Sequence, residues 1–185
     1  MRFFAGIALA VTTPGCVSTQ IDETTPSIET LKLLRARDIA PVSLGTFTDV
    51  RDGAGSGRSI NIRGSTLHAA KGKRFVDFLK DTMATELKAS AKLDPNSPIT
   101  ISAALNESRA GENLSSGGAS LGAKFSISRS GVAAFSKQYR VDTKWESDFL
   151  GAIAIPEAFR QYNALYALLV REAFADPEFV AALRK

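Results

Sequence analysis

The fold is decided by one continuous stretch, residues 99–146, which reads ITISAALNESRAGENLSSGGASLGAKFSISRSGVAAFSKQYRVDTKWE. Apolar and polar residues alternate along three parts of this stretch, which predicts three strands that each bury one face. The side chains expected to point inward are Ile99, Ile101, Ala103 and Leu105; Leu121, Ala123, Phe125 and Ile127; and Phe135, Tyr139, Val141 and Trp145. A Ser130-Gly131 turn separates the last two strands, and residues 109–118 are expected to form a loop between the first two. One wet face and one buried face are typical of an antiparallel sheet that is covered on a single side.

Apolar residues at helical spacing flank this stretch on both sides. Such spacing predicts one helix within residues 71–93, which residues 94–96 (Asp-Pro-Asn) are expected to end. It predicts a second helix from Pro156 to Ala173, because proline is favoured at the first position of a helix. Residues 176–177 (Asp-Pro) should break this helix and leave a short final one.

The remaining elements complete a two-layer α+β fold. Residues 39–47 have the pattern of a strand, with Val42 and Leu44 on one face, and a shorter strand is expected at 59–63. We therefore predict an antiparallel sheet of about four strands with two helices packed on one face, in the order β-(β)-α-β-β-β-α. The apolar segment 149–155 could line a groove or contact a partner, but packing under the second helix as core is the expected use.

Composition limits the classes of protein to which this chain can belong. The chain has 185 residues and a formal net charge of +4, which is mildly basic and does not indicate nucleic-acid binding. Its length predicts a single domain, residues 39–185. There is one cysteine, so an internal disulfide is excluded.

That cysteine follows a stretch with the layout of a secretory signal. Arg2 precedes a nine-residue apolar run, residues 3–11, and small or polar residues come next. The run is too short to span a bilayer, which needs about 20 apolar residues. The sequence Thr13-Pro14-Gly15-Cys16 then resembles the lipobox of bacterial lipoproteins.

The lipobox resemblance implies an anchor and a location. In that family the cysteine thiol takes a diacylglycerol thioether, a peptidase cuts before the cysteine, and the freed amine receives an acyl chain such as palmitate. It implies a signal peptide at residues 1–15 and a lipidated N-terminus with a tether at 16–38, whose leucines could already dock on the domain. Val17 follows Cys16. By resemblance to enteric lipoproteins, this residue favours the periplasmic side of the outer membrane.

The predicted layout also resembles small envelope lipoproteins of Gram-negative bacteria. The predicted elements between residues 39 and 173 carry this resemblance, and no motif does. The families concerned are the auxiliary lipoproteins of ABC-type lipid transport and the lipopolysaccharide-assembly lipoprotein. The resemblance implies an accessory role in envelope assembly or lipid transport, with an envelope protein or a lipid as the partner.

Evidence for catalysis in the sequence is restricted to one motif. Residues 118–122 match the G-x-S-x-G pattern of serine hydrolases, which needs a strand before Ser120 and a helix after it. The residues that follow alternate as a strand, and His68 precedes the serine, against the hydrolase order. We therefore expect a protein that is not an enzyme. A lipid-anchored hydrolase using Ser120 and a cell-wall-binding module are the alternatives.

No metal or cofactor is expected. There is one histidine, and the resemblance implies that Cys16 is acylated. Asp49 and Asp52 lie beside glycines, where two carboxylates are typical of turns. The glycine-rich segment 53–59 lacks the lysine of a phosphate-binding loop.

One charged segment is a candidate binding site. Residues 53–76 contain five cations and no acidic residue. These cations are Arg58, Arg63, Lys71, Lys73 and Arg74. They form either a solvated surface or a site for an anionic partner such as a lipid phosphate.

Overall fold

The computed structural model describes residues 18–21, 23–50 and 57–184 of the chain. The helices are α1 (Ile28–Ala36), α2 (Phe75–Ala89), α3 (Gly151–Ala175) and α4 (Pro177–Ala182). The strands are β1 (Ser18–Gln20), β2 (Ser43–Asp49), β3 (Ser59–Ile62), β4 (Ser65–His68), β5 (Ile99–Glu112), β6 (Ser116–Arg129) and β7 (Val132–Glu146). The α+β class is confirmed.

The three strands predicted from the alternating stretch form most of the main sheet. Its order is β2-β5-β6-β7, and β5, β6 and β7 pair antiparallel. The side chains expected to point inward are buried along β5 and β6, and on β7 they are buried or partly buried. Ser130 and Gly131 both have positive φ, as a two-residue hairpin turn requires. The pattern of alternation therefore predicted both the strands and their faces.

The sheet is mixed, which corrects the prediction of a purely antiparallel one. Strand β2 lies at one edge and pairs parallel with β5. Helix α2 lies between these two strands in the chain, and a connection through a helix returns the chain to the same end of the sheet. Alternation along a strand reports which face is buried, and it carries no information about the direction of the neighbouring strand.

Strands β5 and β6 are longer than expected, so the predicted loop at residues 109–118 is mostly sheet. They stay paired as far as Glu112 and Gly117, and only residues 113–115 connect them. Because the two strands supply each other's hydrogen bonds, the glycines and serines of this segment are held extended despite their low preference for strands. A register shift after Leu105 turns Ser108 inward, where its hydroxyl is 2.7 Å from the hydroxyl of Tyr162.

A second, three-stranded sheet accompanies the main one, in the order β1-β4-β3. The short strand predicted near residues 59–63 is β3, and it forms a hairpin with β4. Arg63 and Gly64, both with positive φ, make the turn. Strand β1 pairs parallel with β4, so the range expected to be a tether contributes a strand here as well as helix α1.

A buried glutamate holds α1 against α2. The Oε1 atom of Glu86 accepts a hydrogen bond of 2.8 Å from the backbone N–H of Ser27, whose own hydroxyl accepts from the N–H of Thr30 at the start of α1. Burial raises the pKa of the Glu86 carboxyl, because the charged form loses its hydration. Ser27, which lies within the expected tether, therefore caps a helix.

The two main helices differ from their predicted limits. Helix α2 begins after Gly72, whose φ is +78°, and ends before Ala91, whose φ is +56°, so it is shorter than residues 71–93. Helix α3 begins at Gly151, since the carbonyl of Leu150 accepts from the N–H groups of Ile153 and Ala154. Pro156 is therefore inside the helix and not at its first position. In the described part of the chain, no helix is both long and apolar enough to cross a membrane.

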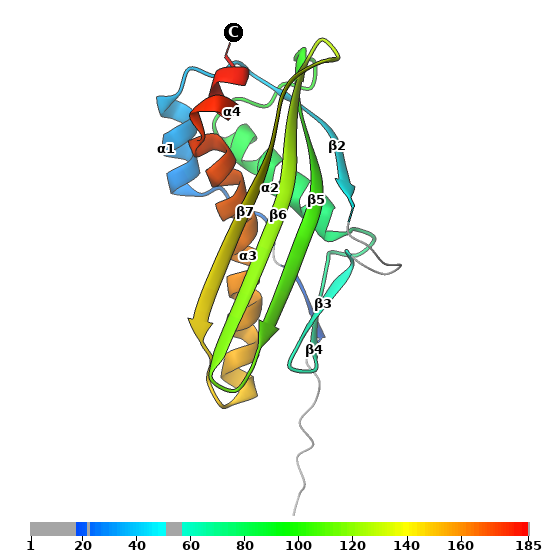
Figure 1. Ribbon diagram of the computed structural model, residues 1–185, viewed down its shortest axis with the longest axis vertical. Coiled ribbons are helices and arrows are strands. Elements are labelled where there is room, and N and C mark those ends of the chain that lie inside the picture. The colour runs from blue at the N-terminus through cyan, green and yellow to red at the C-terminus, as the bar shows by residue number, and fades with distance from the viewer. Residues whose placement is uncertain (1–17, 22, 51–56, 185) are drawn as a thin grey trace, which may run out of the picture.

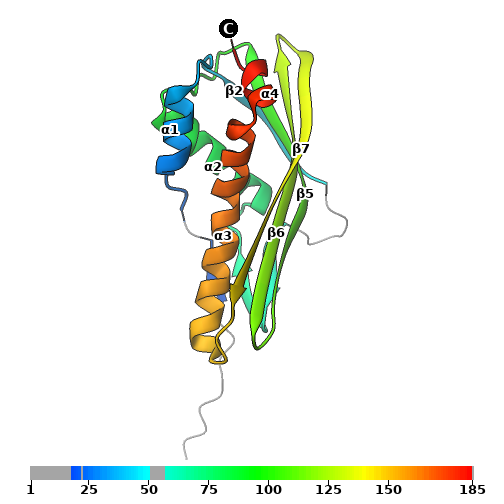
Figure 2. The same cartoon turned by 60° about the vertical axis from the view of Figure 1, so that its left-hand side comes forward.

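The helices cover one face of the main sheet and leave the other face open (Figures 1 and 2). Tyr162 and Tyr166 of α3 are fully buried, and their rings contact Phe75 and Phe78 of α2 edge to face. At the end of the molecule that carries α4, Phe179 is fully buried. This core is the one that the helical spacing predicted.

The apolar segment 149–155 is not core, which corrects its expected use. Phe149 is 73% exposed, Leu150 59% and Ile153 56%. Only Ala154 is fully buried, and Ile155 is partly buried. Phe149 and Leu150 belong to the short connection between β7 and α3, and Ile153 to the first turn of α3, where no described element covers their side chains.

Candidate functional site

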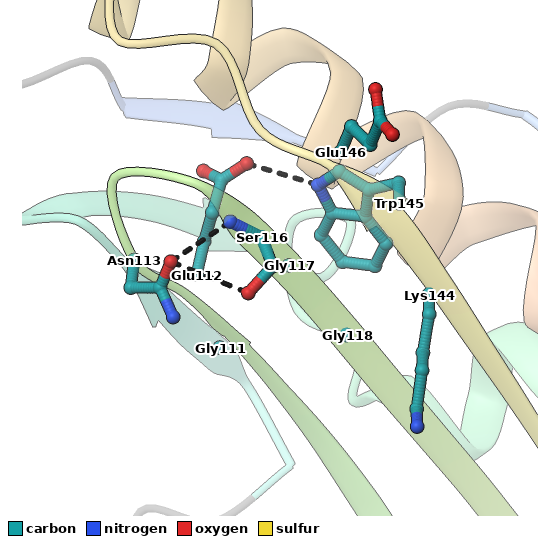
Figure 3. A pocket seen from close by; sticks show the side chains of 9 residues that line it. All are labelled: Gly111, Glu112, Asn113, Ser116, Gly117, Gly118, Lys144, Trp145 and Glu146. Carbon is teal, nitrogen blue, oxygen red and sulfur yellow. Dashed lines mark hydrogen bonds between the residues drawn. The ribbon is translucent and has the colours of Figure 1, made fainter.

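The end of the sheet opposite α4 carries an open hollow of about 680 Å³ (Figure 3). It lies where β5 and β7 end and β6 begins, beside the connection from β7 to α3. Three of its lining residues are glycines on adjacent strands, which leave the sheet surface without side chains. The lining consists of Gly111, Glu112, Asn113, Ser116, Gly117, Gly118, Lys144, Trp145 and Glu146.

An indole ring lies against a glycine in this hollow. Trp145 is directly opposite Gly117 in the register of β6 and β7. A Cβ atom at Gly117 would be 2.2 Å from the indole ring, so only glycine leaves room for the ring in this position. The indole Nε1–H donates to Oε1 of Glu112 at 2.9 Å (Figure 3). The other oxygen of Glu112 is buried and has no hydrogen-bond partner among the described residues.

A side-chain amide holds the turn beside the hollow. The Oδ1 atom of Asn113 accepts from the backbone N–H groups of Ser115 and Ser116, at 2.9 and 2.8 Å. This is the local hydrogen bonding for which asparagine is favoured in turns. Leu114 is consequently displayed at the outside of the turn, with 62% of its surface exposed.

Leu114, Phe149, Leu150 and Ile153 together form what we call the apolar tip. The backbone N–H of Ser147 donates to the carbonyl of Ser115 at 3.1 Å, which ties the β5–β6 turn to the connection between β7 and α3. The polar hollow and the apolar tip therefore lie at the same end of the molecule. Trp145 and Glu112 point to one face of the sheet, whereas Lys144, the neighbour of Trp145 on β7, points away from them (Figure 3). The hollow and the tip together place polar groups next to aliphatic and aromatic surface, an arrangement that suits binding of an amphipathic partner.

The cations predicted as one site are divided between two places. The carbonyl of Arg58 accepts from the N–H of Ala69, so Arg58 lies near the start of α2, as do Lys71, Lys73 and Arg74. Lys73 pairs with Asp81 at 2.6 Å, and this hydrogen bond raises the pKa of the lysine. Arg63 is at the other end of the hairpin, roughly 13 Å away by strand geometry. An anionic partner for these cations stays a prediction.

Arg63 belongs to the apolar tip instead. Its guanidinium donates to the carbonyls of Asp148 and Phe149, at 2.9 and 3.1 Å. The hairpin of β3 and β4 is thereby joined to the start of α3. No signal in the sequence links Arg63 to residues so distant along the chain.

Ser120 lies in the middle of β6, which runs as a continuous strand from Ser116 to Arg129. Its hydroxyl donates to Oε1 of Glu107 at 3.0 Å, and Arg140 pairs with the same carboxylate at 3.1 Å. The strand, sharp turn and helix of a hydrolase elbow are not found around Ser120 in this described segment. Whether the protein has catalytic activity stays a prediction.

Other predicted features lie partly outside the described residues. Cys16, Asp52 and residues 53–56 fall outside them, whereas Asp49 ends β2. Within the described ranges, no group of three or more His, Cys, Asp or Glu residues is placed to hold a metal ion.

Sequence reasoning missed Glu112, Gly117 and Trp145 as a group. It assigned Trp145 to the core and residues 109–118 to a loop. A usable signal was Leu114, a single apolar residue within the polar segment 111–118. Connecting segments lie at the surface and often carry binding residues, so an apolar residue in one of them was a candidate for contact with a partner.

A comparison with one solved structure shows a shared fold. Protein XCC0632 of Xanthomonas campestris, of the DUF330 family, superposes with a TM-score of 0.57 at 14% identity, over 86% of this chain and 95% of that one. A minor lipoprotein of Acinetobacter baumannii superposes with a TM-score of 0.39 at 14% identity, over 72% of this chain and 91% of that one. Rare lipoprotein B of Shewanella oneidensis superposes with a TM-score of 0.40 at 8% identity, over 72% of this chain and 90% of that one. No protein-family model and no curated protein matches the chain.

Proposed function

We propose that this protein is a membrane-anchored, non-catalytic lipoprotein that serves as an accessory binding component in outer-envelope assembly or lipid transport. In this proposal residues 1–15 are a signal peptide and Cys16 carries the acyl chains. The observation that carries it is the apolar run at residues 3–11, followed by Thr13-Pro14-Gly15-Cys16 directly ahead of the folded domain. One acyl chain binds a membrane weakly, whereas two or more hold a protein there stably.

The position of the first strand supports the proposal. Strand β1 starts at Ser18, only two residues after Cys16. An extended chain spans at most about 3.3–3.6 Å per residue, so an anchor on Cys16 would hold this part of the domain within roughly 7 Å of the acylated residue. The valine at position 17 favours the periplasmic side of the outer membrane.

The anchor is tested with the full chain expressed in a Gram-negative host that is fed a labelled palmitate analogue. We expect the wild type to incorporate the label and to remain with the membranes after a salt wash. Cys16→Ala should lose both properties, because the chain has no other cysteine. Ser18→Ala, which leaves the cysteine in place, is the matched control. An unmodified thiol at Cys16 in the mass spectrum of the mature protein would refute the proposal.

The binding role is tested by affinity purification from detergent-solubilised envelopes. We expect a defined protein or lipid to accompany the wild type and to be reduced by Lys144→Glu, which reverses a charge in the hollow. Lys124→Glu makes the same change on the exposed face of β6, outside the hollow. If both variants retain equally little of the partner, the hollow is not its binding site.

The two alternatives have direct tests. Esterase activity of the wild type that disappears in Ser120→Ala would establish the hydrolase in place of the binding protein. Retention of the protein on isolated peptidoglycan would favour a cell-wall-binding module. We do not expect the esterase result, since Ser120 lies within a paired strand and its hydroxyl is bonded to Glu107.

A further inference from the structure

Exposed apolar side chains gather at one end of the molecule. Seven large apolar residues of the described chain are more than half exposed, and four of them belong to the apolar tip. The other three, Ile28, Val50 and Val132, lie at separate places. Single exposed apolar residues are normal on soluble proteins, whereas grouped ones mark a surface that contacts a partner.

The apolar tip is held in position by hydrogen bonds. The Oδ1 atom of Asp148 accepts from the N–H of Leu150 at 2.7 Å, and the carbonyl of Leu150 starts helix α3. Arg63 holds the two preceding carbonyls, of Asp148 and Phe149. The exposure of these side chains is therefore built into the backbone and does not come from a loose loop.

The chain enters the domain at the same end. Ser18 is paired with Thr66 in the small sheet. Thr66 is three residues after Arg63, which contacts the carbonyl of Phe149. In Figure 1 the β3–β4 hairpin, the β5–β6 turn and the start of α3 lie together at the lower end, and α4 lies at the opposite end. An anchor two residues before Ser18 would hold the apolar tip, and not α4, at the membrane.

We infer that the apolar tip inserts into the boundary between the headgroups and the acyl chains of the bilayer that holds Cys16. This inference rests on the proposed function, because it uses the lipid on Cys16 to bring the surface and the bilayer together. Aliphatic and aromatic side chains at the end of a helix partition favourably into this boundary. Insertion fixes the domain with its long axis away from the membrane and leaves the hollow at the membrane surface.

The charge around the apolar tip indicates which lipids matter. Glu146 and Asp148 are acidic and exposed, whereas the guanidinium of Arg63 is already bonded to backbone carbonyls. The tip therefore has no excess of free cations for anionic headgroups. We expect insertion into zwitterionic bilayers that is insensitive to salt, in contrast to binding through a basic patch.

The test uses the lipidated full chain in phosphatidylcholine vesicles. Cys16 is the only cysteine and would be blocked by the lipid, so one added cysteine can carry a polarity-sensitive fluorophore. Phe149→Cys places the label at the apolar tip. Val132→Cys places it on a side chain that is 70% exposed at the start of β7, at the other end of the sheet. We expect blue-shifted emission, quenched by nitroxide-labelled lipid, at position 149 only.

The outcomes separate this inference from the proposed function. If the protein does not float with the vesicles at all, the lipid anchor fails. If it floats but the label at position 149 remains in water, the anchor stands and the inference is overturned. A label at 149 that is shielded by a second copy, with doubled mass by light scattering and no quenching by nitroxide lipid, also overturns it. Quenching that 1 M salt abolishes contradicts the apolar mechanism.

Discussion

The two ends of this molecule treat apolar side chains in opposite ways. At the α4 end, Phe179 is fully buried and its ring contacts four other aromatic rings edge to face. At the other end, Phe149 is 73% exposed although it belongs to an equally apolar segment. The two ends differ in whether another element of the chain packs over the apolar side chains. Helix α4 folds back beside β7 after the break at Asp176, whereas the side chains of Phe149 and Leu150, in the connection from β7 to α3, remain mostly exposed.

Polar groups at the two ends differ in the same sense. Asp176 accepts from Tyr139 at 2.6 Å, pairs with Lys137 at 2.8 Å and caps α4 through the N–H of Glu178. Glu112, at the other end, keeps one buried oxygen without a partner among the described residues. Unpartnered buried oxygens also occur on Thr30 of α1 and Glu86 of α2, so the contrast concerns Asp176 and Glu112 themselves and not every polar group at the two ends.

The largest effect on stability is expected from Phe179→Ala. Removing a fully buried ring leaves a cavity among its aromatic neighbours, and such changes cost about 3–5 kcal/mol. Urea unfolding followed by circular dichroism measures the loss. A cost below about 1 kcal/mol would show that the α4 end is not the stabilising end.

Asp176→Asn should lower the free energy of unfolding by about 1.5–3 kcal/mol at neutral pH, because it removes the charged partner of Lys137 and Tyr139. Burial by itself would raise the pKa of Asp176, but hydrogen bonds from Lys137, Tyr139 and the N–H of Glu178 outweigh it and lower the pKa to about 2.

The lowered pKa of Asp176 makes the stability of the protein depend on pH in a defined way. Its contribution to stability is present above the ordinary value of 3.8 and is lost as the pH falls towards about 2. Thermal unfolding between pH 5 and 2 should therefore show a steeper loss for the wild type than for Asp176→Asn. Parallel curves would contradict the role of the charge.

Gly117→Ala is expected to lower the free energy of unfolding by roughly 1–2 kcal/mol. The added Cβ would overlap the Trp145 ring and displace it from Glu112. Trp145 is the only tryptophan, so its fluorescence spectrum reports the displacement directly. Gly111→Ala is the matched control in the same hollow, because a Cβ there meets nothing within 4 Å. Unchanged fluorescence in Gly117→Ala would mean that the ring does not rest on this glycine.

Phe149→Ser should change the stability least, by about 0.5 kcal/mol or less, since the side chain is already in water. Urea unfolding of this variant beside Phe179→Ala compares the two ends with one measurement. A cost similar to that of Phe179→Ala would mean that Phe149 is covered in solution and that the contrast between the ends is wrong.

Local patterns were sufficient for the elements and insufficient for the site. Alternation predicted the inward faces of β5, β6 and β7, and helical spacing predicted that α2 and α3 cover them. The hollow was missed because Glu112, Gly117 and Trp145 come from three strands and meet only through register. Register depends on pairing between distant segments, which no window of sequence contains.

By itself, the order of residues determined the class of fold, the buried face of each long strand and a pattern ending at Cys16 that is typical of a lipid anchor. These properties depend on neighbours within a few residues, through side-chain periodicity and turn geometry. Only the tertiary structure decided that β2 runs parallel to β5, that Arg63 holds the start of α3, and that residues 149–153 are exposed. An apolar side chain is buried only where another part of the chain arrives to cover it, and that arrival is a property of the whole packed fold.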